Sequence, residues 1–190
     1  MAMYLKTPLS EEDVLKLKAG DVVYLSGIIY TARDLAHRKI LELGRKGKLP
    51  FDIKGAVIYH CGPVVRKTEK GFEIVSAGPT TSARMDKYSD EILALGGKGI
   101  IGKGGMGEKT LKALQRYKGV YFAFTGGAGA LAAKSIKKVK DVYWLDELGV
   151  PEAVWVLKIK NLPLIVAIDS YRNSLYANIE KELEKRLKAI

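Results

Sequence analysis

The sequence predicts an α/β domain in which helices are layered against a mixed sheet. Apolar runs typical of strands alternate with stretches of helical periodicity, and glycine turns separate them. A long β-rich stretch near the end can pair antiparallel, which makes the sheet mixed or doubled. The chain has 190 residues, 47% of them hydrophobic, which is enough for one core. We expect a single domain over residues 1–190, with residues 1–20 as an N-terminal appendage and 174–190 as a C-terminal helix.

The first third of the chain predicts two helices around a strand. A capping-box pattern, S-x-x-D, begins at Ser10 and predicts a short helix over 11–18. Residues 21–32 are rich in β-branched and aromatic types, and Gly27 inside this strand indicates a bulge or a close backbone approach. Residues 32–47 carry an apolar stripe at helical spacing and end in glycines, which predicts a helix.

The middle of the chain continues the alternation. Residues 55–61 form an unbroken apolar run, typical of a strand buried on both faces. Residues 64–78 hold a Lys70–Gly71 turn between two short strands, which predicts a hairpin. Apolar residues at three-to-four spacing predict a helix over 85–97.

The second half predicts further strand–helix pairs and a β-rich end. We expect a short strand that enters a glycine loop, then a helix, then a strand, a glycine turn and another helix; these cover residues 98–105, 106–117 and 120–136. Residues 141–149 and 153–170 supply two or three late strands. Residues 175–190 repeat leucine or isoleucine four apart, which is one helical face.

The composition excludes several classes of protein. Cys61 is the only cysteine, so an internal disulfide is impossible. Structural zinc and iron–sulfur sites need several cysteines, so this chain cannot hold either through cysteines alone. No apolar run approaches the roughly 18 residues of a membrane span, and residues 1–14 lack a secretory signal pattern. We expect a soluble, cytoplasmic protein without a membrane partner.

The net charge of +11 favours an anionic partner: a nucleic acid, an acidic protein or a small polyanion. A short lysine cluster is interpreted as a solvated helix end; it comprises Lys134, Lys137, Lys138 and Lys140. A basic nucleic-acid-binding module is one hypothesis. However, no RRM, KH or helix-turn-helix signature is present, and the aromatic residues fall mainly in expected core strands.

Glycine-rich turns follow several expected strands, where α/β proteins bind ligands. Gly102, Gly104 and Gly107 match G-x-G-x-x-G by letter and precede a helix. However, residues 120–125, about 20 positions on, contain no acidic residue for a ribose contact. We favour a tight turn whose backbone faces an anion over a nucleotide site.

Three cations follow expected strands or turns: Arg33, Arg84 and Lys103. If the strands are neighbours, these side chains converge on one sheet edge and can clamp a dicarboxylate, although each alone is more often a surface residue. Thr80 and Thr81 precede Arg84 and either cap the next helix or supply a hydroxyl. A threonine hydroxyl acts as a base only where cations lower its pKa.

The histidines do not form a standard catalytic set. His37 lies one helical turn after Arg33 and Asp34, where it orients Asp34 or is simply a polar surface residue. His60 ends an apolar strand and is typical of a core histidine. There is no Ser-His-Asp order and no carboxylate pair at an apolar site.

Four stretches resemble one family in order and spacing: GDVVYLSGIIYTARDLAHRK, AVIYHCGPV, SAGPTTSARMDKYSD and GIIGKGGM. They resemble the β subunit, equivalent to the C-terminal domain, of class I iron–sulfur fumarate hydratases and L-tartrate dehydratases. The ending EAVWVLKIKNLPLIVAIDS is similar to the terminal strands of that family. The resemblance covers about Leu5 to Tyr176, and its S-G-x-I-Y-x-A-R-D-x-x-H and G-P-T-T-x-x-R-M-D motifs are long and specific.

The resemblance implies a swivelling β/β/α domain and reversible hydration of fumarate to L-malate, with dehydration of L-tartrate as the alternative. It implies an α subunit as partner, in a hetero-oligomer; the isolated chain is expected to be inactive, and a homodimer is its alternative state. The 4Fe-4S cluster is expected on the α subunit, where it acts as a Lewis acid. This chain is expected to hold no cofactor or metal.

The resemblance also assigns the site. Substrate binding falls on Arg33, Thr80, Arg84 and Lys103. The cations bind the carboxylates and stabilise the aci-carboxylate formed when the C3 proton leaves. Thr80 resembles the proposed base, and Asp34 and His37 are expected to orient Arg33 or Thr80. Residues 125–128 resemble a loop near the site, whereas His60 and Cys61 receive no role.

Overall fold

The computed structural model describes residues 2–69 and 71–188, and strands and helices alternate along most of them. The strands are β1 (Met3–Lys6), β2 (Val22–Thr31), β3 (Val57–Tyr59), β4 (Val64–Thr68), β5 (Gly71–Ser76), β6 (Gly99–Gly102), β7 (Val120–Ala123), β8 (Ile136–Tyr143) and β9 (Val154–Ile168). The helices are α1 (Glu11–Leu15), α2 (Asp34–Arg45), α3 (Asp86–Ala94), α4 (Glu108–Tyr117), α5 (Gly129–Ser135), α6 (Leu145–Leu148) and α7 (Leu175–Leu187), with a 3₁₀ turn, η1, over Ser82–Met85.

The main sheet is mixed and closes on itself. Its strand order is β1-β2-β3-β6-β7-β9-β8, and β2 also pairs with β9. Strands β2, β3, β6, β7 and β9 therefore form a ring. The pairs from β1 to β7 are parallel, whereas β9 runs antiparallel to β2, β7 and β8. The α/β fold with a mixed sheet is thus confirmed.

The core fills the ring and the space beneath the helices. All five ring strands contribute side chains to one buried cluster, which includes Val57 and Tyr59 of β3. Ile58, between them, packs instead with Ile40 of α2 and Ile92 of α3. Because neighbouring residues of a strand point to opposite faces, β3 is buried on both, as its unbroken apolar run predicts.

The N-terminal residues join the sheet through a close contact at Gly27. β1 pairs in parallel with β2, and the Thr7 hydroxyl donates a 2.6 Å hydrogen bond to the Ile28 carbonyl. Gly27 has a φ of 113°, and a Cβ there would lie 2.3 Å from the Thr7 hydroxyl oxygen. The register of β2 against β9 shifts at the same place, which confirms the predicted bulge and close approach. The extent of the domain and its division into appendages stay predictions.

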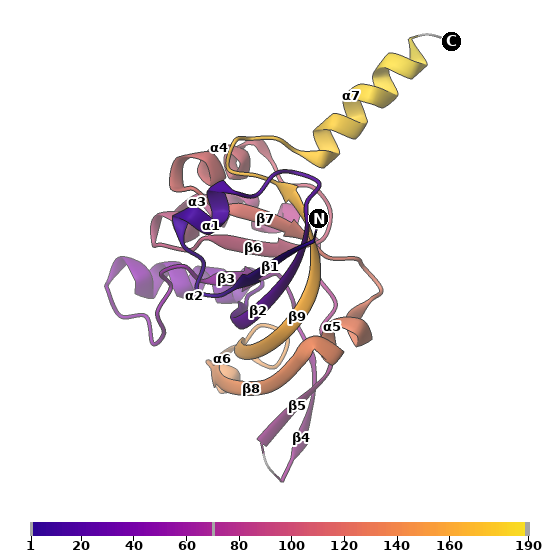
Figure 1. Cartoon of the computed structure of the whole chain (residues 1–190). Helices are drawn as coiled ribbons and strands as arrows, with labels where there is room; N and C mark the ends of the chain where they lie inside the picture. Colours follow the sequence, from indigo (N-terminus) through magenta and orange to yellow (C-terminus); the bar gives the residue numbers. More distant parts are fainter. Residues whose placement is uncertain (1, 70, 189–190) are drawn as a thin grey trace.

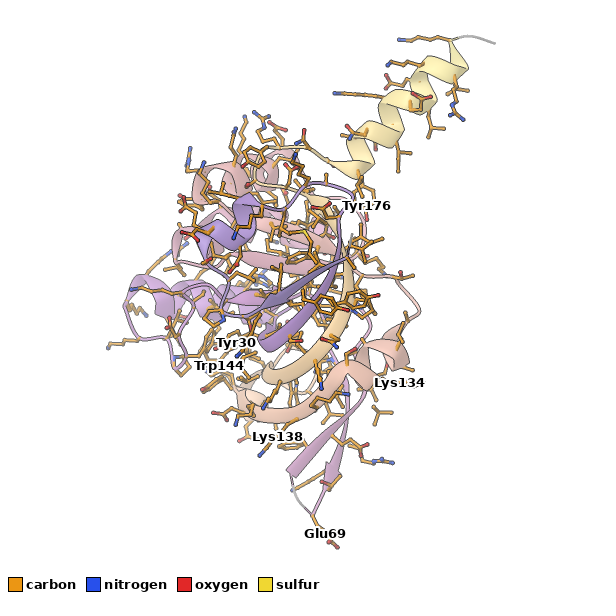
Figure 2. The ribbon with its side chains drawn as sticks, in the orientation of Figure 1. Tyr30, Glu69, Lys134, Lys138, Trp144 and Tyr176 are labelled. Atoms are coloured by element: carbon orange, nitrogen blue, oxygen red, sulfur yellow. The ribbon has the colours of Figure 1, made fainter. Side chains whose placement is uncertain are left out.

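The late strands differ from the sequence expectation. β9 is one strand of 15 residues that contacts three neighbours. The strand expected over 141–149 is wrong in its second half, because Trp144 adopts a left-handed φ of 61° and ends the extended chain before α6. Figure 1 shows β8 at the outer side of β9, and Figure 2 labels Trp144 near its end.

The lysine cluster lies mainly on β8 and not at a helix end, so that interpretation was wrong. Lys134 belongs to α5, whereas Lys138 lies in β8 directly opposite Lys158 of β9, and Figure 2 labels Lys134 and Lys138. β8 is an edge strand of the sheet. Lysines on an edge oppose pairing with another chain, which gives this charge a structural reason.

Two elements project from the body of the molecule (Figure 1). The β4–β5 hairpin is the predicted one, although Lys70 of its turn lies outside the described residues. The C-terminal helix α7 extends in another direction, and Ile179, Leu183 and Leu187 on its predicted apolar face are exposed.

Candidate active site

The carboxyl ends of β2, β3 and β6 meet at one edge of the ring. Thr31 pairs with Tyr59, and Tyr59 pairs with Ile101. Because these parallel strands are in register, the chain leaves them at the same level. Arg33 lies two positions beyond Thr31, and Lys103 lies two positions beyond Ile101. The structure therefore brings Arg33 and Lys103 to the same edge.

Arg84 reaches this edge by a route that the sequence did not predict. The strand before it, β5, belongs to the separate hairpin. The chain then returns through two isolated bridges, Cys61 with Pro79 and Thr81 with Lys103. Arg84 follows in η1. Arg84 thus follows a turn, as the sequence indicates, and the two bridges, not a strand of the main sheet, carry its segment to the edge.

Hydrogen bonds of Ser82 hold this returning segment against Lys103, a role that the sequence analysis did not identify. Its backbone N–H donates to the Lys103 carbonyl at 3.0 Å, and its hydroxyl oxygen accepts from the Lys103 N–H at 3.2 Å. The same hydroxyl lies 2.9 Å from Nδ1 of His60 and can donate to it. Gly102 leaves the room, because a Cβ there would fall 1.7 Å from the Ser82 oxygen. In the sequence, the glycine directly before Lys103 in GIIGKGGM was the feature that could have indicated this close contact.

Arg84 contacts both Thr80 and Asp34. Nη2 of Arg84 donates to the Thr80 hydroxyl at 3.1 Å and lies 3.2 Å from the Asp34 carboxylate. The arginine and aspartate side chains are 47% and 30% exposed, so this ion pair adds little stability. Neither threonine caps η1 through its side chain: Thr81 occupies the cap position without such a bond. The capping interpretation was therefore wrong, and the Thr80 hydroxyl faces a cation instead.

His37 is buried beneath the edge and holds the backbone of Arg33. Its Nδ1–H donates to the Arg33 carbonyl at 2.7 Å, because a carbonyl oxygen can only accept. Burial lowers the pKa of His37 to about 4, against the opposing effects of this bond and of Asp34. The ring stacks on Tyr88 and meets His60 edge-on. His37 is therefore neutral near pH 7, and the described contact is with Arg33 and not with the Asp34 side chain.

The Lys103 side chain packs against the loop that follows β7. The Lys103 stem lies against Gly126, where a Cβ would fall 2.9 Å from Lys103 Cδ. This contact puts residues 125–128 beside the edge.

Cys61 is fully buried, and burial raises the pKa of its thiol to about 12 despite the nearby Arg33. Such a thiol stays protonated and is a poor nucleophile or metal ligand.

Arg33 lies between the backbone of Gly62 and a glutamate that was also missed in the sequence. A Cβ on Gly62 would fall 2.9 Å from Arg33 Cδ and 3.0 Å from its Nη1. Nε of Arg33 lies 3.5 Å from Oε1 of Glu152. Glu152 is far along the chain, in the connection before β9, so local pattern gave no signal for this contact.

The helix that follows the glycine loop is already occupied at its N-terminus. The Asp86 carboxylate accepts from the Gly107 N–H at 2.8 Å and from the Thr110 hydroxyl at 2.7 Å. An internal carboxylate thus takes the backbone donor that a nucleotide phosphate would need at α4. This geometry argues against a nucleotide at G-x-G-x-x-G.

The described residues, 2–69 and 71–188, lack both a cluster of metal-binding side chains and a helix that could span a membrane. Within these residues, no group of three or more His, Cys, Asp and Glu side chains could hold a metal ion. The same residues include no helix long and apolar enough to cross a membrane.

Comparison with known proteins agrees with the motif order. The family model described as "Fumarase C-terminus" matches residues 1–179. A Methanocaldococcus jannaschii protein named "Putative L(+)-tartrate dehydratase subunit beta" is 50% identical over 97% of this chain and 96% of its own length. The "L(+)-tartrate dehydratase subunit beta" of Escherichia coli K12 is 42% identical, over 98% and 92%. A Geobacillus stearothermophilus protein named "Putative fumarate hydratase class I" is 46% identical over 95% of this chain but 35% of its own length. The chain belongs to the fumarase C-terminus family, and these relatives are named for the β subunit of L(+)-tartrate dehydratase and for class I fumarate hydratase.

Proposed function

We propose that this chain is the β subunit of a two-subunit hydro-lyase that reversibly hydrates fumarate to L-malate. The observation that carries the proposal is that Arg33, Arg84 and Lys103 come to one sheet edge, where Arg84 donates to the Thr80 hydroxyl. Two guanidinium forks and an ammonium group suit the two carboxylates of a four-carbon substrate. No carboxylate pair or reactive thiol is needed in this role.

The proposed chemistry of this chain is electrostatic binding together with proton transfer. Loss of the C3 proton places negative charge on the neighbouring carboxylate, and fixed cations stabilise that charge in the transition state. Thr80 is the proposed base. The Arg84 guanidinium donates to its hydroxyl oxygen, and a cation in that position favours the alkoxide form. His37 keeps the Arg33 backbone in place from below.

The remaining half of the site is proposed to belong to a partner. Two of the relatives carry "subunit beta" in their names, and this chain spans nearly their whole length. We expect an α subunit that carries the 4Fe-4S cluster, whose open iron site would supply Lewis acidity to the substrate hydroxyl. The residues described above would bind and orient the carboxylates against it.

L-tartrate is a second candidate substrate. The relatives of matching length are named for tartrate dehydratase, whereas the one named for fumarate hydratase is a longer chain. Malate and tartrate differ by one hydroxyl group, and both present two carboxylates. The basic edge of this chain is therefore compatible with either substrate, and the choice between them rests on groups that contact that hydroxyl.

An anaerobic assay of the complex with its native partner tests the proposal. The complex, captured through this chain, is supplied in turn with fumarate, L-malate and both enantiomers of tartrate. Ultraviolet absorbance follows loss or gain of fumarate with the first two substrates, and gain of oxaloacetate, the product of tartrate dehydration, with the tartrates. Turnover of fumarate and malate supports the leading proposal, and turnover of L(+)-tartrate alone supports the second. A complex without hydro-lyase activity that binds RNA or DNA with steep salt dependence contradicts both.

A further inference from the structure

The Glu152 carboxylate joins two groups at the start of α2. Its Oε2 accepts a hydrogen bond from the Leu35 N–H at 2.8 Å, and its Oε1 lies 3.5 Å from Nε of Arg33. The Glu152 side chain is only 16% exposed. Arg33 itself gives no side-chain cap to α2. One carboxylate from a distant segment therefore caps the helix and faces the arginine that precedes it.

The segment that carries Glu152 is held against the end of β2. The Ala153 N–H donates to the Gly149 carbonyl at 2.8 Å. The buried Thr31 hydroxyl donates to the Ala153 carbonyl at 3.3 Å and accepts from the Trp155 N–H at 3.0 Å. These bonds hold the backbone around Glu152 against the end of β2, two residues before Arg33. The Glu152 carboxylate is therefore held in place relative to Arg33.

The Arg33 guanidinium has its Nε enclosed beside Glu152, whereas its two Nη groups are left for a ligand. Its Nε is buried and has no hydrogen-bond partner, and Glu152 is the acidic group beside it. The Gly62 backbone also approaches Arg33 closely, because a Cβ there would lie 2.9 Å from Cδ and 3.0 Å from Nη1. Within residues 2–69 and 71–188, neither Nη group donates a hydrogen bond to a protein atom, and the nearest approach of Glu152 is to Nε. These Nη groups are the donors that a carboxylate fork requires.

We propose that Glu152 is a positioning residue that sets the plane of the Arg33 guanidinium for a substrate carboxylate. The inference rests on the proposed role of Arg33 as a carboxylate ligand. Two effects of the glutamate oppose each other: its charge weakens the attraction for an anion, and its contact fixes the fork. The Arg33 side chain is 28% exposed, so solvent screens the first effect, whereas a misplaced fork loses its paired geometry. Orientation therefore dominates.

Glu152→Gln in the assembled complex tests the proposal. The amide oxygen still accepts from the Leu35 N–H, so the helix cap is kept, but the charge facing Nε is lost. We expect the KM for the dicarboxylate to rise about tenfold while kcat changes less than about twofold. Glu147→Gln is the matched control, because Glu147 ties α6 to α2 through Lys39 at 2.6 Å without touching Arg33. Its KM should equal that of the wild type.

An Arg33→Lys background separates positioning from a structural role. Lysine has no Nε–H fork, so adding Glu152→Gln to Arg33→Lys should raise KM no further. An unchanged KM in Glu152→Gln alone, or the same tenfold rise in the lysine background, overturns the proposal. A wild-type KM in Arg33→Lys alone contradicts the carboxylate-binding role of Arg33, which identifies the proposed function as the part that failed.

Discussion

Gly102→Ala should detach the segment that carries Thr80 and Arg84 from the sheet edge. A Cβ at this position would lie 1.7 Å from the Ser82 hydroxyl oxygen and 3.0 Å from its Cβ. Ser82 must then move, and its contacts with His60 and with the Lys103 N–H are lost. Overpacking a core costs about 1–3 kcal/mol, and each lost hydrogen bond costs about 1 kcal/mol. We expect a loss of roughly 3–5 kcal/mol in the free energy of unfolding.

Urea denaturation of the isolated chain measures this loss, with Gly105→Ala as the matched control. Gly105 lies in the same loop, and a Cβ there meets only the Tyr176 ring, at 3.7 Å. Its effect should stay within about 0.5 kcal/mol of zero. Adding Ser82→Gly to Gly102→Ala removes the clashing hydroxyl and should restore part of the stability. Equal stability of the two single variants would refute the packing account of Ser82 and Gly102.

The remaining predictions concern protonation, thiol reactivity and substrate binding. Because burial lowers the pKa of His37 to about 4 in the folded chain, the unfolded chain binds more protons below pH 6.5, and His37 should lower stability by about 2 kcal/mol between pH 7 and pH 5. The buried His60, whose pKa is also lowered, adds to this fall. Urea titrations at both pH values should show a smaller fall for His37→Asn than for the wild type, and an equal fall would contradict the assignment. Cys61 should resist a thiol reagent at pH 7 in the native chain and react at once in urea; rapid native modification would disprove its burial. Arg84→Ala in the complex should lower kcat/KM at least about thirtyfold, from the loss of roughly 2 kcal/mol of charge-assisted contact, with Arg66→Ala on the hairpin as an inert control.

Local pattern was sufficient for most of the elements and for the fold class. Strand β3 and the bulge at Gly27 were predictable because continuous apolar runs and an isolated glycine in a strand have local physical causes. The end of β8 was not predictable, because Trp144 ends the strand in a left-handed conformation, and β-branched and aromatic composition does not indicate such a break. Closure of the ring by β2 and β9 depends on pairing between residues more than a hundred positions apart, such as Val22 and Ile165.

The residues of the candidate site were likewise predictable only in part. Arg33 and Lys103 stand at strand ends, so parallel register alone was enough to bring them together. Ser82 and Glu152 were missed because each acts through one contact across the fold: Ser82 through the space at Gly102, and Glu152 through the start of α2. Contacts of this kind depend on tertiary packing and leave no periodic signal in the sequence.

The most direct test of the central claim compares Lys103→Ala with Lys109→Ala in the anaerobically assembled complex. Both lysines follow the same strand, but Lys103 lies at the basic edge against Gly126, whereas Lys109 is exposed on α4. The measurement is kcat/KM for hydration of fumarate and for dehydration of L(+)-tartrate. We predict a fall of at least about tenfold for Lys103→Ala with the physiological substrate, from loss of one charge-assisted contact, and wild-type values for Lys109→Ala. Equal activity of the two variants would contradict a dicarboxylate site at this edge.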